Sequence, residues 1–218
     1  MFRRYAIPAA GVAALVFLVW AIRYFLTMPG KEEIVNYPSS GTTIVAFGDS
    51  LVAGLGSERG GGFAAFLSEK LAAEPVSGVK SEVVNLGGSG DTTEDALGRV
   101  EQIFAHDPKV VIILLGGNDF LRRIPKETAF RNLDEIVARI QERGAIVLLL
   151  GVKGAIFGDN AEEYYAELAE RRGAAYIPNI LDGIFGRAEL MYDGIHPNDA
   201  GYEKIAERIY FALRELIE

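Results

Sequence analysis

Cysteine is absent from the 218-residue chain, and histidine occurs only twice, as His106 and His196. The lack of cysteine excludes disulfides, thiolate metal sites, a cysteine nucleophile and a lipid-modified cysteine. Two histidines are also too few for a metal site built on three imidazoles. Any mechanism that needs an imidazole therefore has only two candidates for it.

Positive charge is also scarce. The chain has 22 lysines and arginines against 30 aspartates and glutamates, which gives a formal net charge of −8. Nucleic-acid binding requires a basic surface, so we expect no nucleic-acid partner. Hydrophobic residues make up 50% of the chain. This excludes a disordered chain and allows one domain with a full core and a short appendage.

One long apolar run stands near the amino terminus. Residues 6–26 contain a single charge, Arg23, and follow Arg3 and Arg4. A helix needs about 20 apolar residues to cross a bilayer, so we expect residues 1–28 to form a membrane anchor. A cleaved signal peptide is the alternative, although the bulky residues after the run make a poor cleavage site. The arginines before the run favour a periplasmic or extracellular position for the rest of the chain.

The remaining chain divides into a linker and one domain. Residues 29–41 contain two prolines and no apolar period, so we expect a tether. In the domain, 42–218, apolar runs alternate with helical patterns, which predicts a flavodoxin-like three-layer α/β/α sandwich around about five parallel strands. The expected strands are 42–47, 82–86, 110–115, 145–150 and 175–177, and the expected helices are 63–73, 92–104, 127–143, 161–172 and 199–216.

Polar and glycine-rich segments follow the expected strands. They are Gly48-Asp49-Ser50-Leu51, the segment 85–92, Gly116-Gly117-Asn118-Asp119 and, before the last helix, the segment 193–198. In open parallel sheets the functional site lies beyond the carboxyl ends of the strands. We therefore expect these four segments to converge on one rim of the sheet.

Ser50, Asp193 and His196 have the chemistry of nucleophilic catalysis. A serine hydroxyl is a weak nucleophile and needs an adjacent base. Imidazole can accept a proton and return it near neutral pH. A carboxylate orients the ring and offsets the imidazolium charge, and Asp193 lies three residues before His196 in the chain. The tetrahedral intermediate also needs hydrogen-bond donors for its oxyanion.

In their order along the chain, the four segments resemble the four sequence blocks of the SGNH (GDSL) hydrolases. They are most similar to the bacterial thioesterase I, protease I and lysophospholipase L1 branch, and the resemblance extends from about residue 42 to the end. It implies a catalytic triad of Ser50, Asp193 and His196. It also implies three oxyanion donors: the backbone N–H groups of Ser50 and Gly90 and the side-chain amide of Asn118. No metal or cofactor is implied.

The resemblance implies a serine esterase that cleaves carboxylic ester or thioester bonds, such as those of aryl esters, acyl thioesters and lysophospholipids. Two alternatives stay open: a deacetylase of cell-envelope carbohydrate, and a binding protein without activity on the same fold. Apolar residues in two loops favour a lipid-like or aryl acyl group over an acetylated sugar. These residues, which alternatively only pack their own loops, are Leu121, Ile124, Val152, Ala155, Ile156 and Phe157.

Three other titratable residues have structural interpretations. We expect Asp49 and Asp119 to hold loops through hydrogen bonds to backbone amides. His106 follows a predicted helix and precedes a predicted strand. That places it at the opposite end of the sheet from the four segments, where a contact with helix-terminal carbonyl groups is expected.

Overall fold

The computed structural model describes residues 30–153 and 161–218. The expected membrane anchor, residues 1–28, lies outside the described residues, and so do Ala155, Ile156 and Phe157. Among the helices of the described ranges, none has both the length and the hydropathy that a membrane span needs.

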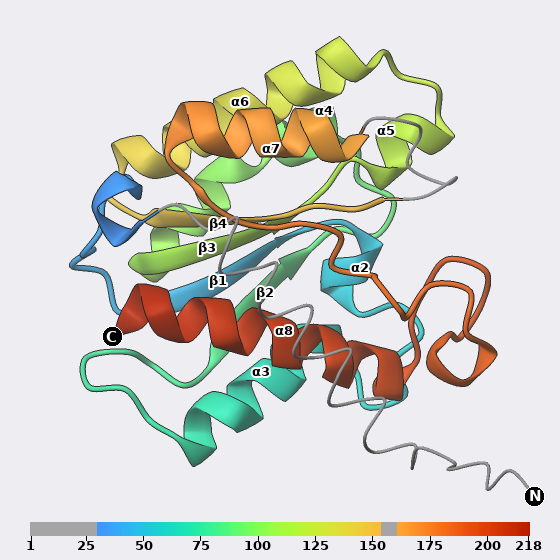
Figure 1. Cartoon of the computed structure of the whole chain (residues 1–218), viewed down its shortest axis with the longest axis horizontal. Helices are drawn as coiled ribbons and strands as arrows, with labels where there is room; N and C mark the ends of the chain where they lie inside the picture. The colour runs from blue at the N-terminus through green and yellow to red at the C-terminus, as the bar shows by residue number, and fades with distance from the viewer. Residues whose placement is uncertain (1–29, 154–160) are drawn as a thin grey trace, which may run out of the picture.

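Five parallel strands form the centre of the domain (Figure 1). Their order, β2-β1-β3-β4-β5, is the flavodoxin-like one. Every residue of β1, β4 and β5 is buried, as expected for strands covered on both faces. The strands are β1 (Thr43–Gly48), β2 (Val83–Gly87), β3 (Pro108–Leu114), β4 (Ile146–Leu150) and β5 (Ala175–Ile177).

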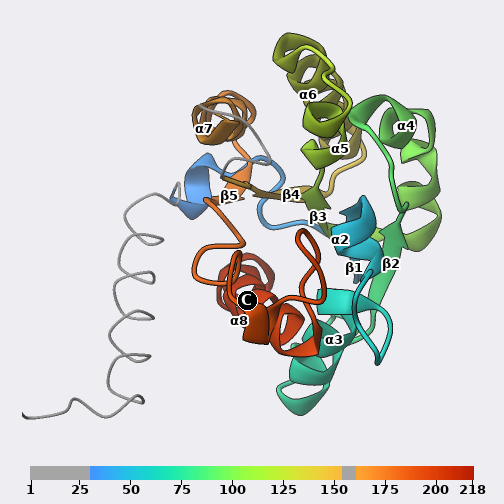
Figure 2. The same cartoon turned by 90° about the vertical axis from the view of Figure 1, so that its right-hand side faces the viewer.

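Helices cover both faces of the sheet, which confirms the predicted three layers. Figures 1 and 2 show α3 and α8 on one side, and α4, α6 and α7 on the other. The α-helices are α2 (Ser50–Ala53), α3 (Gly62–Ala73), α4 (Thr93–Gly98), α5 (Gly117–Leu121), α6 (Lys126–Glu142), α7 (Ala161–Arg172) and α8 (Asp199–Ile217). Three short 3-10 helices are η1 (Lys31–Glu33), η2 (Val100–His106) and η3 (Ala188–Leu190).

The single helix predicted at residues 92–104 is broken in the structure. Thr92 begins α4 with a capping box that it forms with Asp95. The α-helix ends at Gly98, and the tighter η2 follows Arg99. Glycine weakens a helix by about 1 kcal/mol relative to alanine, and the Arg99 side chain is engaged elsewhere, as described below.

Part of the segment predicted as a linker, residues 29–41, packs on the domain. Ile34 is 6% exposed and belongs to the hydrophobic core. The Asn36 amide donates to the backbone oxygens of Gln141 and Ala145, at 2.7 and 3.0 Å. Ser39 Oγ donates to the Gly144 oxygen at 2.8 Å. Polar contacts with backbone oxygens help to hold the segment in place. Such contacts leave no hydrophobic pattern in the sequence.

Candidate active site

Ser50 begins α2 directly after β1, at the carboxyl edge of the sheet. The preceding Asp49 is 4% exposed, and its side chain caps the helix by accepting the Leu51 N–H at 3.0 Å. A Cβ at Gly48 would lie 2.1 Å from the Leu114 carbonyl oxygen, so the turn requires glycine there. The predicted loop-holding role of Asp49 is confirmed.

The structure brings Ser50, His196 and Asp193 together in one chain of contacts. Ser50 Oγ lies 3.0 Å from His196 Nε2. On the other side of the ring, His196 Nδ1 lies 2.9 Å from Asp193 Oδ2. These are hydrogen-bond distances between a hydroxyl, an imidazole and a carboxylate. The arrangement allows the imidazole to accept the hydroxyl proton while the carboxylate orients the ring.

Asp193 is fixed by its own loop as well as by the imidazole. Its Oδ1 accepts the backbone N–H groups of His196 and Ile195, each at 2.7 Å. These bonds, the His196 N–H first among them, lower the pKa of Asp193 to about 2. The carboxylate therefore stays ionised at neutral pH.

The Asp193–His196 segment is a short closed loop in front of α8. The Tyr192 N–H donates to the His196 carbonyl oxygen at 2.8 Å, and Met191 pairs with Pro197 in an isolated antiparallel bridge. Asn198 then caps α8 by accepting the Gly201 N–H at 3.1 Å. Figure 1 shows this part of the chain at the same edge of the sheet as α2 and α5. The packing of α8 and of the loop before it thus places His196 next to Ser50.

Of the residues expected to bind an oxyanion, Asn118 lies beside Ser50, and Gly90 lies in a loop that contacts Asn118. Asn118 lines the same pocket as Ser50 and His196. Its amide donates to the Asp91 carbonyl oxygen at 2.9 Å, which ties α5 to the loop that carries Gly90. Gly90 has a φ of +85°, a left-handed conformation that favours glycine. Among the described residues other than its chain neighbours, a Cβ at this position would come within 4 Å only of Arg122 Nη2, at 3.8 Å.

Arg99 is a structural contributor that the sequence interpretation missed. Its guanidinium donates to Asp91 Oδ2 at 2.6 Å and to the carbonyl oxygens of Leu86 and Gly48, at 2.9 and 2.8 Å. It also lies over the Phe47 ring, 4.4 Å from its centroid. Arg99 thereby joins the ends of β1 and β2 to the Gly90 loop. The sequence shows only one arginine in a helical pattern and does not indicate these partners.

Asp119 is buried and has a structural role, as predicted. Its two carboxylate oxygens accept the hydroxyl and the N–H of Thr93, at 2.7 and 2.9 Å. The pair joins the start of α4 to α5. His106 ends η2 just before β3, at the opposite end of the sheet from Ser50, which also agrees with the prediction.

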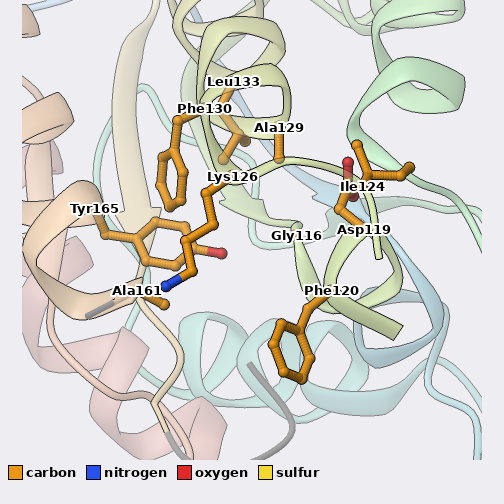
Figure 3. Close-up of a pocket in the computed structure, with 10 residues that line it drawn as sticks. All are labelled: Gly116, Asp119, Phe120, Ile124, Lys126, Ala129, Phe130, Leu133, Ala161 and Tyr165. Carbon is orange, nitrogen blue, oxygen red and sulfur yellow. The ribbon is translucent and has the colours of Figure 1, made fainter. Parts of the chain in front are cut away.

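The expected substrate-binding residues separate into different places. Leu121 lines the pocket with Ser50 and His196. Ile124 lines a second, largely apolar pocket, shared with Phe120 from α5 and with side chains of α6 and α7 (Figure 3). Val152 lines neither of these two pockets: it is 2% exposed and packs in the hydrophobic core. The hydrophobic character of Val152 did not distinguish a core residue from a pocket residue.

Figure 3 shows how the second pocket is built. Phe130 and Tyr165 form one side, and the Lys126 side chain extends across the pocket towards Tyr165. The Tyr165 hydroxyl donates to the Leu115 carbonyl oxygen. Burial raises the pKa of Tyr165, so its hydroxyl remains a neutral donor. The wall of this pocket is therefore firmly attached to the end of β3.

Among the described residues, no group of three or more histidine, cysteine, aspartate or glutamate side chains is placed to hold a metal ion.

A family model agrees with this geometry. The model of the GDSL-like lipase/acylhydrolase family matches residues 46–204, a range that holds all four motif segments. The chain belongs to this family. Membership in the GDSL family makes it an SGNH-type esterase or acylhydrolase, as the sequence blocks predict.

Individual members of the GDSL family match over most of the chain. Esterase TesA of Pseudomonas aeruginosa is 32% identical over 191 residues, which are 84% of this chain and 94% of the relative. Thioesterase 1/protease 1/lysophospholipase L1 of Escherichia coli is 28% identical over 80% of this chain and 85% of its own. A crystal structure of TesA superimposes with a TM-score of 0.73 at 33% identity, and covers 80% of this chain and 99% of that chain.

Proposed function

We propose that the protein is a serine hydrolase that cleaves carboxylic ester or thioester bonds through an acyl-enzyme on Ser50. The observation that carries the proposal is the 3.0 Å contact between Ser50 Oγ and His196 Nε2, with Asp193 on the other ring nitrogen at 2.9 Å. A nucleophile, its base and the residue that orients the base are the three parts that acyl transfer requires.

In the first half-reaction, Ser50 Oγ attacks the ester carbonyl carbon and its proton moves to His196 Nε2. The tetrahedral intermediate then collapses: the bond to the leaving oxygen or sulfur breaks, and His196 returns the proton to the leaving group. In the second half-reaction, His196 takes a proton from water, which attacks the acyl-enzyme. The acid leaves, and Ser50 regains its proton. The ionised Asp193 offsets the positive charge on the ring in both halves.

The oxyanion is stabilised by N–H donors that are already fixed. An amide side chain has two N–H donors. One N–H of Asn118 is held by the Asp91 carbonyl oxygen, so the rotation of the amide is set and the second N–H is left for the substrate. The backbone N–H groups of Ser50 and Gly90 complete the proposed set, and preorganised donors of this kind are worth about 3 kcal/mol each in the transition state.

The walls of the site favour an apolar acyl group. Leu51, Leu121 and Ile195 line the pocket around Ser50. Across α5 lies the second apolar pocket, where Ile124 and Phe120 are found. We propose that medium or longer acyl chains, or aryl groups, use these surfaces. The names of the relatives, an esterase and a thioesterase with lysophospholipase activity, agree with this substrate class.

A substrate panel tests the function and its alternatives. We would measure kcat/KM for p-nitrophenyl esters of increasing acyl length, an acyl-CoA and a lysophospholipid. The proposal expects rates that increase beyond the acetyl ester. A maximum at acetyl, with turnover of acetylated carbohydrate, would favour a deacetylase instead. The absence of turnover on every substrate would favour a binding protein.

We further propose that residues 1–28 anchor the enzyme in a membrane, with the domain on the periplasmic or outer side. The support is the composition of residues 6–26 and the arginines before them. A reporter fused after Glu218 should then behave as an exported protein. Reporter activity in the cytoplasm would contradict this topology.

A further inference from the structure

Arg122 lies next to the proposed oxyanion site although no catalytic role has been assigned to it. It follows α5 directly, four residues after Asn118. Its Nη2 donates to the Gly90 carbonyl oxygen at 2.7 Å. The same nitrogen is the only heavy atom that a Cβ on Gly90 would meet within 4 Å. The guanidinium therefore lies against Gly90, one of the residues of the proposed oxyanion site.

The charge of Arg122 is incompletely offset in the structure. The nearest carboxylate is Asp95, at 3.8 Å from Nη1, and both side chains are more than half exposed, at 57% and 53%. Asp95 is also committed to the capping box of α4, since its Oδ2 accepts both the N–H and the hydroxyl of Thr92. A guanidinium has five N–H donors in a planar fork. Contacts with Gly90 and Asp95 leave donors for a further anion.

The setting makes this positive charge unusual. The chain has a formal net charge of −8, and the proposed site itself contains the ionised Asp193. In such surroundings the binding of a neutral ester is not affected by the negative charge. An anionic ester would be repelled unless a cation lay close to its anionic group. Arg122 provides a cation beside Gly90, one of the proposed oxyanion donors. Guanidinium groups suit carboxylate and phosphate because their fork matches two anionic oxygens.

We infer that Arg122 is a specificity-determining residue that favours esters with an anionic group, a carboxylate or a phosphate, close to the scissile carbonyl. The inference rests on the proposed hydrolase function and narrows its substrate class. The anionic group can belong to the acyl part or to the leaving alcohol, and the chemistry of recognition is the same in both cases.

Two pairs of substrates test the inference on the full-length protein in detergent solution. The first pair places charge on the acyl side: p-nitrophenyl hexanoate and the mono-p-nitrophenyl ester of adipic acid. The second places it on the leaving side: a monoacylglycerol and the lysophosphatidic acid with the same acyl chain. For each pair, the ratio of kcat/KM for the anionic ester to that for the neutral ester is measured. The pair that responds identifies the side.

Three variants separate charge recognition from other effects. Arg122→Gln removes the charge and leaves an amide donor on a shorter side chain, and should lower the ratio about tenfold in at least one pair. Arg122→Lys should retain most of the ratio. Arg123→Gln is the matched control: Arg123 is exposed, neighbours Arg122 and has the same charge, so its ratio should remain that of the parent. The parent's ratio should also fall with added salt, and that of Arg122→Gln should not.

Several results would overturn the inference. One is an equal loss of kcat/KM for the neutral and anionic esters in Arg122→Gln, because Arg122 would then act only by holding the Gly90 loop. Another is an equal change in the ratio for Arg122→Gln and Arg123→Gln. The overall charge of the protein, and not Arg122 itself, would then determine the preference for anionic esters. A parent that hydrolyses none of the four esters, neutral or anionic, would instead contradict the proposed function, so the two failures are distinguishable.

Discussion

The two histidines of the chain lie in different surroundings, and each serves as a control for the other. His196 contacts Ser50 and Asp193, whereas His106 ends a 3-10 helix at the far end of the sheet. His196→Ala should leave the fold intact and lower kcat by about 10⁴-fold or more, because the serine hydroxyl is no longer activated. His106→Ala should retain turnover and cost about 1 kcal/mol of stability. A fully active His196→Ala enzyme would exclude the triad.

The nucleophile has its own pair of controls, because two serines occur in the first two motif segments. Ser50→Ala should abolish labelling by a fluorophosphonate probe and reduce kcat by several orders of magnitude. Ser89→Ala should still be labelled. Labelling that persists in Ser50→Ala and disappears in Ser89→Ala would move the nucleophile to the second segment.

The raised pKa of the buried Asp49 carboxyl should make the free energy of unfolding depend on pH. Burial raises the pKa of Asp49 to about 7 from 3.8. Between these values the folded state keeps a proton that the unfolded state has released, so this residue lowers the free energy of unfolding as the pH rises from about 4 to 7. Its stabilising contribution is complete below pH 4 and lost above the folded pKa. Asp49→Asn keeps an oxygen for the Leu51 N–H and should remove this slope in urea titrations.

Asp134 provides the control of opposite sign. Hydrogen bonds from Arg172 lower the pKa of Asp134, with a further contribution from Arg171. Its contribution to stability is therefore present at neutral pH and lost as the pH falls below its unfolded value. Asp134→Asn should destabilise the protein at pH 7 and have little effect in acid. If Asp49→Asn behaved in the same way, the buried carboxyl would be ionised in the folded protein.

At the scale of single residues, the motifs located Ser50, Asp193 and His196 because their chemistry depends on residue type and short spacing. The same reasoning did not predict that Val152 packs in the core, since an apolar side chain after a strand fits a core or a pocket equally well. The role of Arg99 could not be predicted from the sequence, because two of its acceptors are the backbone carbonyl oxygens of Gly48 and Leu86, which lie on two different strands. Only the folded sheet brings them to one guanidinium.

At the scale of elements, Arg99 joins β1, β2 and α4, and its loss should affect the site and the stability together. Arg99→Ala leaves Asp91 without its ion pair and two strand-end carbonyls without a donor, at a cost on the order of 3 kcal/mol. The Gly90 loop is then less well held, so kcat should fall more than KM rises. Arg99→Lys should recover part of the stability but less of kcat, because an ammonium cannot reach three acceptors as a planar fork does.

Arg139→Ala is the control for the loss of an arginine from a helix. Arg139 pairs with Glu135 on the exposed face of α6, at 2.8 Å, and such pairs contribute about 0.5 kcal/mol. Thermal unfolding and kcat/KM of both variants distinguish the two cases. If Arg99→Ala had effects as small as those of Arg139→Ala, Arg99 would not couple the strand ends to the Gly90 loop.

Element by element, the alternation of apolar runs and helical patterns predicted the five strands and the long helices α3, α6, α7 and α8. It missed α2 and α5, which have 4 and 5 residues and are too short for a helical period to appear. It also merged α4 with η2, because the apolar spacing continues across Gly98. The break depends on a tertiary contact of Arg99, which no local pattern contains.

At the scale of the whole molecule, the amino-terminal boundary of the domain leads to a prediction. Deletion of residues 1–28 should leave a stable, active enzyme, because the hydrophobic core described above begins at Ile34 and the site residues all follow it. Deletion of residues 1–40 removes Ile34 from the core and the donors Asn36 and Ser39. Loss of a buried aliphatic side chain alone costs about 2–5 kcal/mol.

Thermal unfolding and kcat/KM of the two truncated proteins should therefore differ. We expect a lower melting temperature for the longer deletion, with the active site changed little because the segment packs far from Ser50. Equal melting temperatures would return residues 31–41 to the role of a tether.

The distance along the chain between Ser50 and His196, 146 residues, has a consequence for biosynthesis. Ser50 leaves the ribosome early, but its base is among the last parts of the domain to be translated. On the proposed mechanism, the nascent protein holds an unactivated hydroxyl until His196 has been translated and has packed beside Ser50. A chain cut before His196 should therefore be inactive towards the acyl esters around it.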